Sequence, residues 1–419
     1  MPASYSATGI LVVALSVRLG LFALLPPSIL DTIAQRVELS TPLTSYHRLK
    51  EGVFLYQHGI SPYDGGVTHQ APLLLAAFSA MDYLPRACHW LVFSLLDVAC
   101  AYWLMAIVRC KAHQTLPKQR KYRLQQTLLD DWQLAVAALY LFNPYTILSC
   151  LACSTLGFVH LSILSAVGLA MQGYGVASMA WLAFASYLDY YPVMLVPAAI
   201  LLLQQTRPAT SSKLLFGWYA GLFLVWLLSL LVVSRVLMGS WEFLDATYGV
   251  ILTVPDLTPN VGLFWYYFME MFDHFRAFFL VVFQMNALVY ALPITYRFRH
   301  HPLYIVFALC GIISVFKSYP SFGDTAFHLA FLPVFRELMP YYRYSFLVAQ
   351  VYAFTGALAV AFYHIWIHVG TGNANFFYAI TLVHALGQIM LLIDTVYAML
   401  RHKFCVDYPR YRQCKVVQT

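Results

Sequence analysis

The residues of this sequence whose types and spacing could support proton transfer lie near position 270. Glu270, Asp273, His274 and Arg276 fall within two helical turns of one another. Carboxylates and an imidazole at this spacing could exchange protons with a substrate. The same charges could instead pair across helical turns and cap a helix, and we favour this structural interpretation. With the aromatic run before them they define a candidate lumenal aromatic and acidic site, which consists of Phe264, Trp265, Tyr266, Glu270 and Asp273.

A second polar segment, residues 38–78, lies between two apolar ones. Its sequence Ser61-Pro62-Tyr63, followed by Ala71-Pro72-Leu73 at a predicted helix start, resembles the first lumenal loop of GPI mannosyltransferases. Those enzymes belong to the GT-C superfamily and take sugar from dolichol-phosphate donors. The resemblance implies paired acids just upstream, which would hold a metal or act as a general base.

The paired acids are missing from this position. Residues 41–46 read Thr-Pro-Leu-Thr-Ser-Tyr, and the next carboxylate along the chain is Glu51. Asp31 and Asp64 are single and widely spaced. We therefore expect a scaffold loop without catalytic carboxylates, in which residues 61–66 make turns.

A third polar group precedes the last apolar segment, where Gly370, Gly372, Asn373 and Asn375 form a predicted turn. Free N–H groups at a helix start favour a phosphate, and carboxamides both donate to and accept from sugar hydroxyls. An Asn N-cap beside interfacial aromatic residues would explain the same pattern without a ligand. The candidate site for such a phosphate or sugar head group, called the candidate head-group site below, consists of Asn373, Asn375, Phe376, Phe377 and Tyr378.

Two further motifs have simpler explanations. Lys317 and Asp324 border a Pro-Gly break between apolar segments, where they could serve a function or form a structural ion pair. Cys150 and Cys153 form a C-x-x-C inside an apolar segment, without a second ligand pair at metal spacing. We expect packing thiols there, and no metal or cofactor.

Composition identifies the elements that must position these residues as membrane helices. The 419 residues are 61% hydrophobic and only 10% charged, whereas soluble domains are about a quarter charged. Several apolar runs of about twenty residues are long enough to cross ~30 Å of hydrocarbon. The net charge of +7 lies in short basic stretches beside these runs, as the positive-inside rule predicts, and not in a nucleic-acid surface.

The sequence therefore predicts an all-α polytopic membrane protein with about 11–12 transmembrane helices in a single domain, residues 1–419. Pro144 and Pro192 interrupt apolar runs and predict broken or re-entrant helices. Short surface helices are expected in two lumenal loops, residues 27–71 and 239–273. Basic loops at 109–131, 205–213 and 297–301, and the tail 401–419, are predicted to be cytosolic. Contacts with anionic lipid are assigned to Arg207, Lys213 and Arg299.

Five strings taken in order resemble the PIG-U family, the U subunits of GPI transamidase. They are NPYTILSC (143–150), VPDLTPNVGLFWYYF (254–268), FKSYP (316–320) with GD (323–324), and NFFYAIT (375–381). The resemblance covers nearly the whole chain. It implies a GT-C-like fold without glycosyltransferase activity, in a complex of the endoplasmic reticulum membrane that joins preproteins to GPI. By the same resemblance a separate cysteine-protease-like subunit cleaves the peptide, and this subunit recruits GPI near Asn373, Asn375 and Tyr378.

Three functions follow from these patterns. The preferred one is a non-catalytic transamidase subunit that binds GPI and presents it to partner subunits. The first alternative is a lipid-linked GPI mannosyltransferase whose acids are Glu51 or Asp64 together with Glu270 or Asp273. The second is a transporter or flippase that uses the breaks at Pro144 and Pro192 as hinges.

Overall fold

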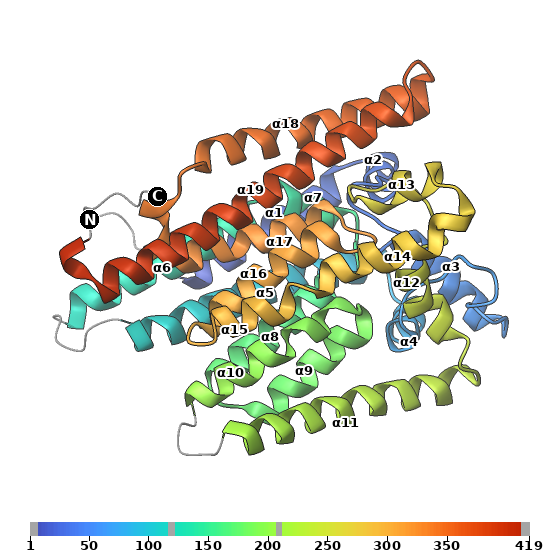
Figure 1. Ribbon diagram of the computed structural model, residues 1–419. Helices are drawn as coiled ribbons and strands as arrows, with labels where there is room; N and C mark the ends of the chain where they lie inside the picture. Colours follow the sequence, from blue (N-terminus) through green and yellow to red (C-terminus); the bar gives the residue numbers. More distant parts are fainter. Residues whose placement is uncertain (1–6, 116–121, 207–211, 412–419) are drawn as a thin grey trace. The chain divides into compact units, whose positions relative to one another are not determined.

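The computed structural model describes residues 7–115, 122–206 and 212–411. Within these ranges the regular structure is entirely helical and no strand occurs (Figure 1). The chain forms two compact units, Met1–Val334 and Phe335–Thr419. The predicted all-α polytopic membrane protein is confirmed, while the single membrane domain expected from the sequence stays a prediction.

Six helices in the described ranges are long and apolar enough to cross a membrane. Each has at least 18 residues, and at 1.5 Å per residue about twenty residues match the ~30 Å of a hydrocarbon core. They are α1 (Ala7–Leu24), α5 (Arg86–Thr115), α11 (Ser212–Met238), α14 with α15 (Asp273–Leu288 and Ala291–Arg297), α18 (Ser345–His364) with the π-helical turn η4 (Ile365–Val369), and α19 (Ala374–Asp407).

Both predicted helix breaks are present. The first separates α6 (Tyr122–Leu141) from α7 (Pro144–Leu151), which meet at an angle of 52° and together form a broken span or a re-entrant loop. Pro144 has no backbone N–H for the helix ladder, and the Asn143 side chain accepts a hydrogen bond from the Tyr145 N–H at 3.0 Å. Similarly, α9 (Gly175–Leu188) ends at the extended residue Asp189, and the chain resumes in η1 (Tyr191–Leu195) and α10 (Val196–Thr206).

Five shorter apolar helices bring the apolar helical elements of the described residues to twelve, counting the bent pair as one. With 10–17 residues they reach at most about 25 Å, less than the hydrocarbon thickness. Two of them, α8 (Leu156–Met171) and α16 (Pro302–Phe316), are buried along most of their length and form the centre of the first unit. The others are α4 (Pro72–Met81), α9, and η1 with α10.

Short helices also occupy the two loop regions, which we define as residues 27–71 and 239–273. The first loop region contains α2 (Pro27–Ala34) and α3 (Tyr46–Gln57). The second contains η2 (Asp245–Gly249), α12 (Val250–Thr253) and α13 (Phe264–Glu270). The first unit also contains α17 (Phe322–Phe331), after a turn at residues 317–321, and then η3 (Leu332–Tyr341) leads into the second unit.

The second unit is an antiparallel hairpin of α18 and α19, which lie side by side in Figure 1. Its base is fixed by Asp394, a carboxylate only 1% exposed. Asp394 accepts hydrogen bonds from the backbone N–H groups of Arg343 (2.8 Å) and Tyr344 (3.1 Å) and forms an ion pair with the Arg343 guanidinium. The hairpin is followed by η5 (Pro409–Tyr411).

Candidate functional site

The tip of the α18–α19 hairpin holds the candidate head-group residues. Gly370 has φ +74°, a left-handed conformation that ends η4 and turns the chain toward α19. Asn373 is the N-cap of α19, and its side-chain oxygen accepts from the Asn375 N–H at 3.0 Å. The Asn373 carboxamide is exposed, so its Nδ2 group can still donate to a bound molecule. Asn373 can therefore cap α19 and contact a ligand at the same time.

The three aromatic residues after this cap have different surroundings. Phe376 is 53% exposed and stacks on Phe362, with ring centroids 5.8 Å apart. Phe377 is fully buried, and its ring packs against Tyr363 at 5.4 Å. Tyr378 is half-buried. Phe376 and Tyr378 can meet a lipid or sugar directly, whereas Phe377 supports the turn from within.

Sequence patterns missed four further ring residues at this tip. Trp366 packs on Phe377 at 6.4 Å, and His364 at the end of α18 lies 5.2 Å from His368 on the π-helical turn η4. Tyr363 contacts both Trp366 and His368. The four-residue spacing of the two histidines was the available signal, because residues four apart share a helix face.

The aromatic and acidic site predicted at residues 264–273 separates into core and surface. Phe264 and Trp265 are 1% and 0% exposed, and Phe264 packs on Phe268 and Phe283. Tyr266 is half-buried, whereas Glu270 and Asp273 are exposed at the adjoining ends of α13 and α14. The two rings therefore stabilise the fold, and the acids face outward.

The favoured pairing of Arg276 with the nearby acids is wrong. Its guanidinium donates to the backbone carbonyl of Val254 at 2.6 Å and lies 5.4 Å from the centre of the Phe268 ring. Val254 has φ +49°, a left-handed conformation that ends α12 and turns its carbonyl toward Arg276. Arg276 therefore fixes the second loop region through a backbone carbonyl.

The stretch that would carry paired acids in a mannosyltransferase is packed against neighbouring turns. Thr41 and Thr44 are buried, and their hydroxyl groups are 3.0 Å apart. The Thr44 carbonyl accepts from the Thr155 N–H at 3.0 Å, and the Glu38 carbonyl accepts from the Phe322 N–H at 2.8 Å. This stretch thus connects two helix-start turns and has no carboxylate aimed into a cavity.

The acids near this stretch are either paired or exposed. Glu38, only 1% exposed, forms a two-point ion pair with Arg36. Asp256 forms an ion pair with Arg48 at 2.7 Å and accepts from Thr258. Burial alone would raise the pKa of Asp256, but the Thr258 hydrogen bonds and the Arg48 charge outweigh it and lower that pKa. The remaining acids of the first loop region, Asp31, Glu51 and Asp64, are exposed.

A histidine joins the two loop regions. The His69 Nδ1–H group donates to the Ala246 carbonyl at 2.8 Å, and burial lowers the His69 pKa. Gln70 donates to the Ser45 carbonyl at 3.0 Å. His69 is therefore neutral near pH 7, and its role is a structural hydrogen bond.

Lys317 and Asp324 do form the structural ion pair that the sequence left open, with a third member. The Lys317 Nζ atom lies 2.8 Å from Asp324 and 3.3 Å from Asp189, and all three residues are buried. Asp324 also accepts from the Ser321 N–H at 2.8 Å, which caps α17. The cluster links the break after α9 to the turn between α16 and α17.

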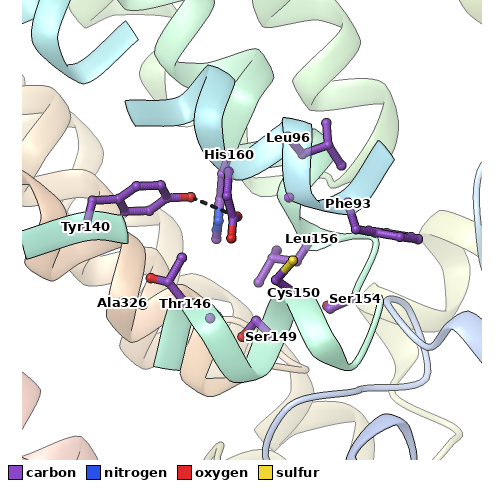
Figure 2. Close-up of a pocket in the computed structure, with 13 residues that line it drawn as sticks. Phe93, Leu96, Tyr140, Thr146, Ser149, Cys150, Ser154, Leu156, His160 and Ala326 are labelled. Carbon is purple, nitrogen blue, oxygen red and sulfur yellow. Dashed lines mark hydrogen bonds between the residues drawn. The ribbon is translucent and has the colours of Figure 1, made fainter. Parts of the chain in front are cut away.

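A small polar cavity lies inside the first unit, beside a second buried ion pair. Arg18 and Asp97 are joined at 2.8 Å, and the Tyr140 hydroxyl donates to Asp97 at 3.4 Å. Figure 2 shows Tyr140, Cys150 and His160 around the cavity, whose volume is about 30 Å³. That volume holds one or two water molecules but no glycolipid. Cys150 and Cys153 are free thiols.

The basic residues assigned to anionic lipid are only partly described. Lys213 is exposed in the first turn of α11, and Arg299 is exposed between α15 and α16, 4.9 Å from the Tyr296 ring. Arg207 lies outside the described residues. Gln205 donates to the His300 carbonyl at 3.2 Å, so the end of α10 and the turn at 297–301 lie on one side of the unit.

Comparisons with known proteins give the same family over nearly the whole chain. The family described as "GPI transamidase subunit PIG-U" matches residues 12–384. The chain is 37% identical to the human "GPI-anchor transamidase component PIGU" over 430 aligned positions, which cover 97% of this chain and 96% of the human protein. It is 35% identical to the "GPI transamidase component GAB1" of Saccharomyces cerevisiae, covering 97% and 99% of the two chains. The Schizosaccharomyces pombe "GPI transamidase component GAB1 homolog" is 33% identical, with 93% of each chain covered.

Proposed function

The chain belongs to the PIG-U family of GPI transamidase subunits, and on that premise we propose that it holds the GPI glycolipid for attachment to preproteins without catalysing the transfer. One observation carries the proposal: the exposed Asn373 cap at the N-terminus of the 34-residue helix α19, beside the exposed ring of Phe376. A carboxamide and a helix N-terminus suit the sugar hydroxyls and phosphates of a glycolipid head. An exposed aromatic ring suits its apolar part.

The non-catalytic role rests on the state of the acids. Among the described residues, the buried carboxylates Glu38, Asp97, Asp189, Asp324 and Asp394 are each in an ion pair. A paired and desolvated carboxylate is a poor general base toward an acceptor hydroxyl. We propose that peptide cleavage belongs to a partner, a cysteine-protease-like subunit of the same complex.

We place the protein in the endoplasmic reticulum membrane with its C-terminus in the cytosol. The hydrogen bond between Gln205 and His300 puts the end of α10 and the basic turn 297–301 on one side of the first unit. Positive-inside bias makes that side cytosolic. The loop regions 27–71 and 239–273 then face the lumen, where preproteins await their anchors.

The experiment is replacement of both tip carboxamides, Asn373→Lys with Asn375→Lys, in cells that depend on this subunit. Losing one or two hydrogen bonds to a charged head group costs about 1.5–3 kcal/mol, or on the order of tenfold or more in binding. Surface GPI-anchored protein should fall by about that factor, and complete GPI should accumulate unattached. Gln35→Lys, an exposed carboxamide in the first unit changed in the same way, should leave anchoring intact.

Two outcomes would contradict the proposal. Accumulation of under-mannosylated GPI would indicate the mannosyltransferase, whose candidate acids can be removed together as Glu51→Ala, Asp64→Ala, Glu270→Ala and Asp273→Ala. Unchanged anchoring in the Asn373→Lys, Asn375→Lys variant, with normal protein abundance, would show that the hairpin tip does not hold GPI.

A further inference from the structure

A cavity of the first unit lies far along the chain from the hairpin tip and has no role so far. Its volume is about 500 Å³, within the range of sites for small molecules. It is formed where α1 ends, where α5 begins, and where α2 and α3 of the first loop region cross between them. All of its lining residues belong to the first unit.

The floor of this cavity is apolar and aromatic. Phe22 and Trp90 stack with centroids 5.4 Å apart, and Leu25, Leu30 and Leu151 complete the apolar lining. Only 17% of α1 is buried inside the protein, and the exposed residues Val12, Val13 and Val17 form an apolar face that is open to lipid. An acyl chain that follows α1 would therefore reach the floor without leaving an apolar environment.

The rim of the cavity is basic. Lys50 and Arg86 line it and are exposed, and among the described residues neither forms an ion pair. The exposed carboxylate Asp31 also lines it, so the two cations and one anion of the lining give a net charge of +1. A rim of this charge matches a head group with one negative charge.

The polar residues between rim and floor are held in place. The His89 Nε2–H group donates to the Met81 carbonyl at 3.1 Å, so its Nδ1 atom accepts from the Tyr46 hydroxyl at 2.8 Å. Lys50 in turn lies 6.0 Å from the centre of the Tyr46 ring. The Tyr46 ring thus positions a cation above the apolar floor.

We infer that this cavity binds one anionic phospholipid, with its phosphate between Lys50 and Arg86 and its acyl chains along α1. An arginine fork matches the geometry of phosphate oxygens, and lysine adds a point charge. An apolar floor beside a lipid-facing helix selects a phosphate that carries acyl chains over a soluble anion. The site is separate from the proposed GPI site and does not depend on it.

Trp90 reports on the occupant, because it forms part of the floor. The full chain in mixed micelles is titrated with dibrominated phosphatidylglycerol or dibrominated phosphatidylcholine, whose bromine atoms quench tryptophan on contact. The Trp90 signal is the difference between the wild type and Trp90→Phe. We expect a roughly fivefold preference for phosphatidylglycerol in that signal, which corresponds to about 1 kcal/mol.

Matched variants test the rim. Lys50→Gln with Arg86→Gln should abolish the preference, whereas Arg297→Gln with Arg410→Gln removes the same charge at exposed residues outside the cavity lining and should keep it. The thermal midpoint of each variant shows that it folds, and the single variants serve if the double variant does not. Excess inorganic phosphate should leave the quenching unchanged.

Three results would overturn the inference. They are equal quenching of Trp90 by both lipids, a preference that survives Lys50→Gln with Arg86→Gln, and full displacement of the lipid by inorganic phosphate. The last would assign the cavity to a soluble anion. None of these measurements involves GPI, so a negative result for the lipid cavity does not contradict the proposed function. A negative result for GPI binding likewise does not contradict the lipid cavity.

Discussion

At the scale of single residues, two sets of buried, paired charges lie inside the first unit. Arg18 meets Asp97 between α1 and α5, and Lys317 meets Asp189 and Asp324 between the helix breaks. A charge in a low-dielectric interior is costly unless it is paired and hydrogen-bonded. These sets therefore specify which helices come together, and removing one member should cost more than removing the pair.

The Arg18–Asp97 pair gives a direct prediction. Asp97→Ala leaves the buried Arg18 with only the carbonyl groups of Leu141 (2.9 Å) and Ala14 (3.4 Å). We expect the free energy of unfolding in mixed micelles to fall by about 3–5 kcal/mol. The double variant Arg18→Met with Asp97→Leu should recover most of this loss. A single variant within about 1 kcal/mol of wild type would show that the pair is not desolvated.

At the scale of elements, helix breaks and close contacts between helices fix the positions of the buried side chains. The 52° bend between α6 and α7 places Cys150 beside Asp97, where the small cavity lies. Close contact between α5 and α8 depends on a residue without a side chain, because a Cβ on Gly168 would lie 2.4 Å from the Trp103 ring. Small residues of this kind let membrane helices approach.

Gly168→Ala is therefore predicted to destabilise the first unit. The added methyl group forces the Trp103 ring away, and such overpacking costs about 1–3 kcal/mol. The thermal midpoint in detergent should fall accordingly, and Trp103→Leu in the same chain should restore part of it.

Gly217→Ala is the matched control for that change. Gly217 lies in α11, where a Cβ would meet nothing within 4 Å. Alanine also favours a helix by roughly 1 kcal/mol over glycine. The control should leave the midpoint unchanged or raise it, and an equal loss in both variants would contradict the packing argument.

At the scale of the whole molecule, the two loop regions and the turns between helices are connected by hydrogen bonds that depend on charge state. His69 bonds to Ala246, and Arg48 forms an ion pair with Asp256. The pKa of His69 is lowered by burial, and the pKa of Asp256 is lowered by Thr258 and Arg48. In both cases the unfolded chain binds protons more readily than the folded chain, so acid should weaken these connections.

Because both pKa values are lowered in the folded chain, we predict that acid destabilises the fold. Stability contributed by neutral His69 is complete above its unfolded pKa near 6.5 and is lost as the pH falls below it, by up to about 1.4 kcal/mol per pH unit. Protonation of Asp256 should reduce the stability further at lower pH. The thermal midpoint in detergent, measured from pH 7.5 downward, should therefore fall.

His69→Asn isolates the histidine contribution. Asparagine keeps an N–H donor for the Ala246 carbonyl but cannot take up a proton. The decline that begins near pH 6.5 should become shallower in this variant, and the decline at lower pH should remain. An unchanged profile would show that His69 does not carry the effect.

Much of the fold could be predicted from the sequence. Apolar runs of about twenty residues predicted the membrane class, and Pro144 and Pro192 predicted both helix breaks. These follow from local physics, because hydrocarbon requires an internally bonded backbone and proline removes a donor. The division into two compact units did not follow, because it depends on contacts between residues distant in the chain.

For the candidate sites, too, some features follow from the sequence and others only from the tertiary structure. By itself the sequence determined the family, the Asn373 cap and the absence of paired acids at residues 41–46, because residue type and spacing decide those. Only the tertiary structure decided that Phe377 is buried, that Arg276 binds a carbonyl, and that Lys50 and Arg86 share one cavity. Burial and pairing are properties of surroundings built from several segments, and no single segment of sequence contains them.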